Sequence, residues 1–218
     1  MPISVPMFGR VTTLREAEAI HETFSSNIIR DLFMEQALGK THEPVVVDCG
    51  INVGITVRWW FHLQPTARVF GIDMMEEAQG SVRKWLDNEK HRLAYTGITA
   101  PLSANDGDEI TIRYSDPLDS WNRIENKRPT TSARTLQTSR LDTLLAPYSL
   151  KRIDLLKIDI EGHANKALLG ATRTLAITQN ICFEHHSEEE IGEVTTLLIK
   201  DGFQLRRSCQ KILWFTRI

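Results

Sequence analysis

The sequence predicts an α/β fold in which a mostly parallel sheet is covered by helices on both faces. Three observations predict it. The β-branched run Val45–Val47 passes directly into Asp48-Cys49-Gly50, which is typical of a buried strand that ends in a tight turn. Short apolar runs then alternate with helix-spaced segments, as in repeated βαβ units. The last two runs, residues 203–207 and 212–218, are separated by only about four residues, which predicts a closing antiparallel hairpin.

Length and composition indicate one domain with an N-terminal extension. The chain has 218 residues, of which 41% are hydrophobic, and a formal net charge of −2. We expect an arm and helical extension over residues 1–40 and the main domain over 41–218. The small charge favours neither a nucleic-acid nor a membrane partner. We see neither a signal peptide nor an apolar run of about 18 residues. Cys49, Cys182 and Cys209 are scattered without metal spacing, so we expect reduced thiols and a cytoplasmic location.

The N-terminal extension has a helical pattern. Thr13 and Glu16 form a capping box. Apolar residues then recur at helical spacing, at Leu14, Ala17, Ile20, Phe24, Ile28 and Leu32. We expect one or two helices over residues 13–38, with a possible break at Ser25-Ser26. They either simply cover a sheet edge, or also close over the ligand or form a homodimer contact.

The turn after the first strand favours a cofactor without phosphate. It reads Asp48-x-Gly50-x-Asn52-x-Gly54 and fails the dinucleotide fingerprint G-x-G-x-x-G at two positions. Asp48 would repel a pyrophosphate and favour a cation, such as an amino group or a sulfonium centre. S-adenosylmethionine (SAM) carries both and has no phosphate. We therefore predict SAM as the cofactor, with Gly50, Asn52 and Gly54 around it.

A second strand ends in another acid. Val69–Asp73 lies about 20 residues after the glycine turn, where a carboxylate accepts hydrogen bonds from ribose hydroxyls. Met74 is then placed against the adenine. The alternative is that Gly50 and Gly54 only punctuate a loop and that Asp73 caps the helix expected over residues 76–90.

A third, weaker strand over residues 94–104 leads to Ser103 and Asp106, which either meet the adenine or form a plain hairpin turn. Residues 115–139 then lack periodicity and are locally basic, at Lys127, Arg128, Arg134 and Arg140, while Trp121 stands alone. We interpret them as a loop, either solvated or acting as a lid that grips the acceptor.

The second half of the chain continues the βαβ pattern. A short helix is expected over residues 141–148, a central strand over 153–160, a helix over 164–175 and another strand over 181–184. Ser187 and Glu190 form a second capping box, which opens a helix that Gly202 closes.

These motifs resemble the FkbM-type SAM-dependent methyltransferases over about residues 45–185. The matching residues are Asp154-Leu155-Leu156-Lys157-Ile158-Asp159-Ile160-Glu161-Gly162, Leu168–Ala171, the Asp48–Gly54 turn, Leu141-Asp142-x-Leu144 and Ile181–Glu184. Two departures concern Asp73, where the family more often has Glu-Pro, and His163-Ala164-Asn165, where it often has a small residue followed by Glu. The resemblance implies a Rossmann-like class I methyltransferase fold with a seven-stranded, mostly parallel sheet. It also implies O-methylation of a hydroxyl on a sugar or small natural product.

The strand tips supply candidates for the base that deprotonates the acceptor. Asp159 and Glu161 follow the central strand, and Glu184 and His185 follow the next. Ligands of open α/β sheets bind at these carboxyl ends, where we expect Asp159 also to face SAM. His185 is the leading base, with Glu184 orienting it, because histidine titrates near neutral pH. His186 should point to the opposite side. The alternative is that both histidines are surface residues.

Three further interpretations stay open. The acids and His185 would also suit Mg²⁺, but nothing in their spacing requires a metal, and we expect none. A nicotinamide-dependent oxidoreductase has a related sheet, although the failed fingerprint and the final hairpin speak against it. The third possibility is a binding protein that keeps the fold but has lost catalysis. The presence of Asp48, Gly50, Asp73 and Asp159 argues against it.

Overall fold

The computed structural model describes residues 3–5, 7–24, 29–87, 91–119, 122, 124 and 130–218. The strands are β1 (Ile3–Val5), β2 (Gly9–Val11), β3 (Val45–Cys49), β4 (Arg68–Asp73), β5 (Tyr95–Thr99), β6 (Glu109–Tyr114), β7 (Ser132–Gln137), β8 (Leu155–Ile158), β9 (Asn180–Glu184), β10 (Phe203–Cys209) and β11 (Ile212–Arg217). The helices are α1 (Leu14–Phe24), α2 (Leu32–Lys40), α3 (Ile55–Leu63), α4 (Glu76–Leu86), α5 (Leu141–Leu145), α6 (Ala164–Leu169), α7 (Thr172–Ala176) and α8 (Glu188–Lys200), with 3₁₀ turns η1 (Arg92–Ala94) and η2 (Ala146–Tyr148).

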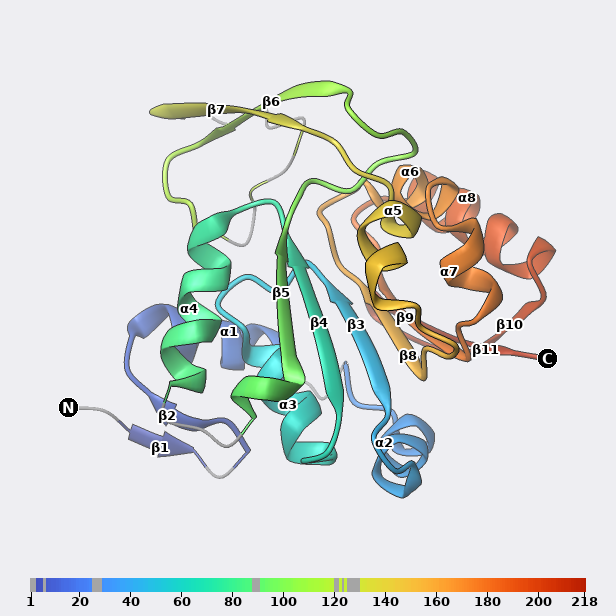
Figure 1. The fold of residues 1–218 in the computed structure, drawn as a ribbon, viewed down its shortest axis with the longest axis horizontal. Helices are drawn as coiled ribbons and strands as arrows, with labels where there is room; N and C mark the ends of the chain where they lie inside the picture. Colours follow the sequence, from blue (N-terminus) through green and yellow to red (C-terminus); the bar gives the residue numbers. More distant parts are fainter. Residues whose placement is uncertain are drawn as a thin grey trace.

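The main sheet confirms the predicted fold. Within the described residues it has seven strands in the order β10-β11-β9-β8-β3-β4-β5. The pairs joining β9, β8, β3, β4 and β5 are all parallel, whereas β11 runs antiparallel to both β9 and β10. The C-terminal hairpin thus closes one side of a parallel sheet, and β3 lies at its centre (Figure 1).

Side chains on successive strand positions enter two different cores. Val46, Val69 and Leu155 face one core, together with α2, α3 and α4. Val47, Phe70 and Leu156 face the other, together with α5, α6, α7 and α8. Because neighbouring side chains of a strand point to opposite faces, an unbroken apolar run such as Val45–Val47 is what a sheet covered on both faces requires.

The N-terminal extension packs onto the first core. Within residues 1–11, expected to be an arm, Ile3–Val5 and Gly9–Val11 form the antiparallel pair β1 and β2. The capping box at the start of α1 is confirmed, because Thr13 N–H donates to Glu16 Oε2 (2.9 Å) and Glu16 N–H donates to Thr13 Oγ1 (3.2 Å). Glu16 also pairs with Arg58 of α3. The possible break at residues 25–26 lies outside the described residues.

The interpretation of residues 115–139 as a loop throughout was wrong. Residues 132–137 form β7, which pairs antiparallel with β6. The hairpin lies beyond the ends of the parallel strands, at the top of Figure 1. Ile112 of β6 is buried, and Arg134 of β7 forms an ion pair with Glu77 of α4 (2.8 Å), so this hairpin is held against the domain. Lys127, Arg128 and Trp121 lie outside the described residues.

None of the described helices is long and apolar enough to cross a bilayer.

Candidate functional site

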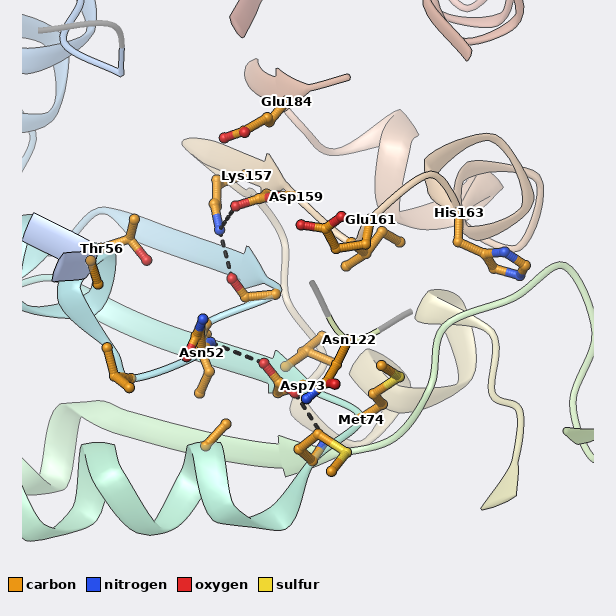
Figure 2. Close-up of a pocket in the computed structure, with 18 of the residues that line it drawn as sticks. Asn52, Thr56, Asp73, Met74, Asn122, Lys157, Asp159, Glu161, His163 and Glu184 are labelled. Atoms are coloured by element: carbon orange, nitrogen blue, oxygen red, sulfur yellow. Dashed lines mark hydrogen bonds and ion pairs between the residues drawn. The ribbon is translucent and has the colours of Figure 1, made fainter. Parts of the chain in front are cut away.

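A cavity of about 440 Å³ opens at the carboxyl ends of the central strands. Its floor comes from the residues that follow β3, β4, β8 and β9, which Figure 2 shows converging on one space. Ala19, Glu22 and Thr23 of α1 line it, as do Pro117, Asp119, Asn122 and Ile124. The N-terminal helix therefore forms part of the cavity wall and does more than cover a sheet edge.

The glycine turn after β3 is shaped by close contact with the end of β8. Gly50 has φ +82°, and a Cβ on it would lie 1.7 Å from the carbonyl oxygen of Asp159. Asn52 also has a positive φ, of 47°. Gly50 and Asn52 line the cavity, as predicted. Gly54 does not line it. Gly54 is the N-cap of α3 with φ +82°, and a Cβ there would lie 2.4 Å from Val82 of α4, so this glycine serves helix packing.

Asp73 ties the glycine turn to the end of β4. Its Oδ2 accepts from Asn52 N–H (3.0 Å) and its Oδ1 accepts from Met75 N–H (2.9 Å). Burial raises the pKa of Asp73, although both N–H groups act to lower it. Asp73 and Met74 line the cavity, and each carboxylate oxygen keeps a lone pair for a further donor. Figure 2 shows the Asn52–Asp73 bond at the edge of the cavity.

Lys157 of β8 is a site residue that the sequence reasoning missed. Its ammonium lies 3.3 Å from Asp48 Oδ1 and 3.2 Å from Asp159 Oδ2, and it donates to Gly50 O (2.7 Å). Burial acts to lower the pKa of Lys157, but the carboxylates of Asp48 and Asp159 raise it well above its ordinary value. The lysine therefore stays charged. The signal was available, because a lysine in the middle of an apolar strand requires a buried partner.

Asp48 lies beneath the site. It is fully buried and does not line the cavity, and Trp60 Nε1–H donates to its Oδ2 (2.7 Å). The expectation that Asp48 faces a cationic ligand group was wrong, because Lys157 already occupies that place. Asp48 instead holds Lys157, and Lys157 in turn holds the Gly50 carbonyl.

The tips of β8 and β9 form the acidic end of the cavity, where Asp159, Glu161, Glu184 and His186 all line it. His186 Nε2 lies 3.3 Å from Asp159 Oδ1, and His186 Nδ1 lies 3.4 Å from Glu161 Oε2. Figure 2 shows Glu184 on the tip adjacent to Asp159.

The charges at this end shift one another's pKa values. Burial acts to raise the pKa of Asp159, but Lys157 and His186 lower it to about 2. Burial and the Asp159 carboxylate raise the pKa of Glu184 to about 7. Burial acts to lower the pKa of His186, yet Asp159 and Glu161 raise it.

The expected register of the two histidines was wrong. His185, predicted to face the acceptor, does not line the cavity, and its backbone N–H donates to Lys211 O (2.9 Å) of the β10–β11 turn. This bond continues the β9–β11 pairing beyond Glu184, so the chain stays strand-like for a further residue. His186 comes next and turns back to Asp159 and Glu161.

Two predicted adenine contacts also lie elsewhere. Ser103 is buried outside the cavity. Asp106 is a turn residue whose carboxylate accepts from Arg140 N–H (2.7 Å) and from Thr143 Oγ1 (2.7 Å). The segment that does line the cavity after β5 is shorter and apolar, at Ala100, Pro101 and Leu102.

Comparisons with known proteins agree with this architecture. The model of the methyltransferase FkbM domain matches residues 48–205. The 2-O-methyltransferase NoeI of Sinorhizobium fredii is 25% identical over 198 residues, which cover 83% of this chain and 78% of that protein. The AMB antimetabolite synthetase AmbE of Pseudomonas aeruginosa is 22% identical over 251 residues; the match covers 94% of this chain but only 12% of AmbE.

Solved methyltransferase structures share the fold at low sequence identity. Aeropyrum pernix fibrillarin, solved with natively bound S-adenosyl-L-methionine, has a TM-score of 0.51 at 11% identity over 87% of this chain and 76% of that one. Precorrin-6y C5,15-methyltransferase of Geobacter metallireducens has a TM-score of 0.50 at 11% identity, over 84% and 83% of the two chains. The sheet is thus that of the class I methyltransferases, and with the family match over most of its length the chain belongs to the FkbM methyltransferase family.

Proposed function

We propose that this protein transfers the methyl group of SAM to a hydroxyl of a sugar or small natural product. The observation that carries the proposal is the cavity itself. One end is formed by the Gly50–Asn52 turn and Asp73, and the other by the carboxylates and imidazole at the tips of β8 and β9. The family match and the SAM-bound fibrillarin support the cofactor, and the similarity to NoeI, a 2-O-methyltransferase, supports transfer to oxygen.

The first end fits the cofactor. Asn52 Oδ1 and Thr56 Oγ1 are buried at the cavity and make no hydrogen bond within the described part of the chain, so both are available to polar groups of SAM. Asp73 accepts hydrogen bonds from the ribose hydroxyls, and Met74 and Ala100–Leu102 pack against the adenine ring. When bound, SAM supplies a methyl carbon that its sulfonium already activates.

The other end receives the acceptor. Asp159, Glu161, Glu184 and His186 orient a hydroxyl toward the methyl group and promote the loss of its proton, while Lys157 holds Asp159 in place. Glu22 and Thr23 of α1, with Pro117 and Asp119, bound the same space and select the acceptor. The lid expected over residues 115–139 is part of this proposal only for the described residues that line the cavity, which are Pro117, Asp119, Asn122 and Ile124.

Calorimetric titration of the protein with SAM and with NAD⁺ tests the cofactor, and isotope-labelled SAM incubated with hydroxylated small molecules tests the transfer. We expect SAM to bind and NAD⁺ not to bind, with label appearing in an ether product. Binding of NAD⁺ in place of SAM would support the oxidoreductase instead. Binding of SAM without transfer to any acceptor would support a non-catalytic protein.

A further inference from the structure

Three potential metal ligands meet where β8 and β9 end. One oxygen each of Asp159 and Glu184 and one ring nitrogen of His186 lie within 4.8 Å of one another. All three residues line the cavity. Ligands opposite each other on Mg²⁺ are about 4.2 Å apart. Small rotations of these side chains would therefore close the set around a cation.

The imidazole of His186 is directed into this cluster, and one of its ring nitrogens has no hydrogen-bond partner there among the described residues. The His186 side chain is only 9% exposed, and its Nε2 makes no hydrogen bond among the described residues, although Asp159 Oδ1 lies 3.3 Å away. On the other side of the ring, Nδ1 lies 3.4 Å from Glu161 Oε2. A carboxylate behind the second ring nitrogen is the usual arrangement of a metal-bound histidine, because it fixes the tautomer that leaves Nε2 free to ligate.

The surrounding charges also favour a cation. Lys157 contacts Asp48 and the Oδ2 atom of Asp159, so the Oδ1 atom of Asp159 is left to face His186. Glu161 and Glu184 add further carboxylates at the same end of the cavity. Such a concentration of negative charge is costly to bury unless cations offset it.

We infer that Asp159, Glu184 and His186 form a binding site for a divalent cation of the Mg²⁺ or Mn²⁺ type. Two carboxylates suit these oxygen-preferring ions, and one imidazole is compatible with Mn²⁺. Three protein ligands leave coordination positions open toward the cavity. The use of the ion rests on the proposed function: it would bind the acceptor hydroxyl and lower its pKa.

The reaction then balances without a protein base. The cation-bound hydroxyl releases its proton to water, and the oxygen's electron pair forms the new bond to the methyl carbon. The carbon–sulfur bond of SAM breaks with its electron pair remaining on sulfur. The products are the methyl ether, S-adenosylhomocysteine and one proton. Acceptors that offer a second oxygen beside the methylated one would be preferred, because both oxygens can ligate the ion.

Mn²⁺ titration of the full chain followed by electron paramagnetic resonance tests the site, with neither SAM nor acceptor present. We expect the wild type to bind a single Mn²⁺, and Glu184→Gln and His186→Ala each to weaken binding by at least about 10-fold. Glu161→Gln, behind the imidazole, should weaken it by about 10–100-fold. The matched controls are His185→Ala and Glu188→Gln, which alter neighbouring residues outside the cavity and should bind Mn²⁺ like the wild type.

Calorimetry with SAM in the presence of EDTA separates the two proposals. Unchanged SAM affinity in the ligand variants, together with lost Mn²⁺ binding, supports the site and shows that the variants fold. Absence of Mn²⁺ binding by the wild type, or equal binding by Glu184→Gln and His186→Ala, would overturn the inference and leave SAM binding as a separate result. Absence of SAM binding by the wild type would instead contradict the proposed function.

Discussion

The two ends of the cavity are built in different ways. The end at β3 and β4 depends on backbone conformation, because Gly50 and Asn52 have positive φ angles and Asp73 accepts from two backbone N–H groups. The end at β8 and β9 depends on charged side chains, with Lys157 set between Asp48 and Asp159 and with His186 against Asp159. The backbone end comes mainly from residues 50–75, whereas the charged end joins Asp48 with residues 157–161 and 184–186.

The largest effect is expected where the two ends are joined. Lys157→Met leaves Asp48 and Asp159 without their buried cation, so it should lower the free energy of unfolding by about 3–5 kcal/mol. Urea denaturation followed by circular dichroism measures this loss. Lys151→Met alters an exposed lysine and should stay within about 0.5 kcal/mol of the wild type. Equal stability of the two variants would show that the Lys157 network is not needed to hold the strand ends together.

Gly50→Ala tests the backbone end alone. A side chain at φ +82° costs about 1–3 kcal/mol, and the added Cβ would also overlap the Asp159 carbonyl oxygen. The variant should lose stability and bind SAM more weakly. The matched change is Gly192→Ala in α8, where an added Cβ meets no atom within 4 Å; it should stabilise the protein by about 0.5–1 kcal/mol. A Gly50→Ala variant as stable as the wild type would show that the close approach of the two strand ends is not required.

The sequence predicted the backbone end well and the charged end only in part. Glycines in a strand–turn–helix pattern limit the turn geometry by themselves, so Gly50, Asn52, Asp73 and Met74 were all placed at the cavity correctly. The alternation of side chains along a strand does not show at which residue the strand ends. One more strand-like residue after Glu184 therefore moved the cavity-facing histidine from position 185 to position 186.

Other parts of the site depended on contacts that no local pattern encodes. The roles of Gly54 and Asp106 follow from Val82 and Thr143, which lie far from them in sequence. The β6–β7 pair was missed because the apolar alternation of residues 110–114 had no visible partner in the polar residues 132–137. Contributions of α1 to the cavity were left open for the same reason.

A smaller effect is expected where α1 is anchored to α3. Glu16 caps α1 and pairs with Arg58, whose side chain is 2% exposed. Glu16→Gln should lower the free energy of unfolding by about 1–3 kcal/mol, because it leaves a buried guanidinium without its counter-charge. Glu18→Gln, at an exposed position of the same helix, is the control. A loss no larger than that of the control would contradict the anchoring role of Glu16.

The stability difference between the wild type and Glu16→Gln should depend on pH with a definite sign. Burial acts to raise the pKa of Glu16, but Thr12 N–H and Arg58 lower it below the ordinary value of 4.5. The contribution of Glu16 is therefore complete above pH 4.5 and is lost as the pH falls through the folded pKa. The gap between wild type and Glu16→Gln should be constant from about pH 7 to about pH 5 and should narrow below that range. A gap that widens in acid would contradict the assigned pairing.

The central claim is that one cavity binds SAM at its backbone end and the acceptor at its charged end. Calorimetric titration of SAM into wild type, Asp73→Ala and Glu184→Gln in the presence of EDTA tests it most directly. We predict that Asp73→Ala weakens SAM binding by about 1–3 kcal/mol, because hydrogen bonds from the ribose to a carboxylate are lost, and that Glu184→Gln leaves SAM affinity unchanged. If Asp73→Ala binds SAM as tightly as the wild type does, SAM does not bind at the backbone end as claimed. If only Glu184→Gln weakens SAM binding, the two ends have been assigned the wrong way round.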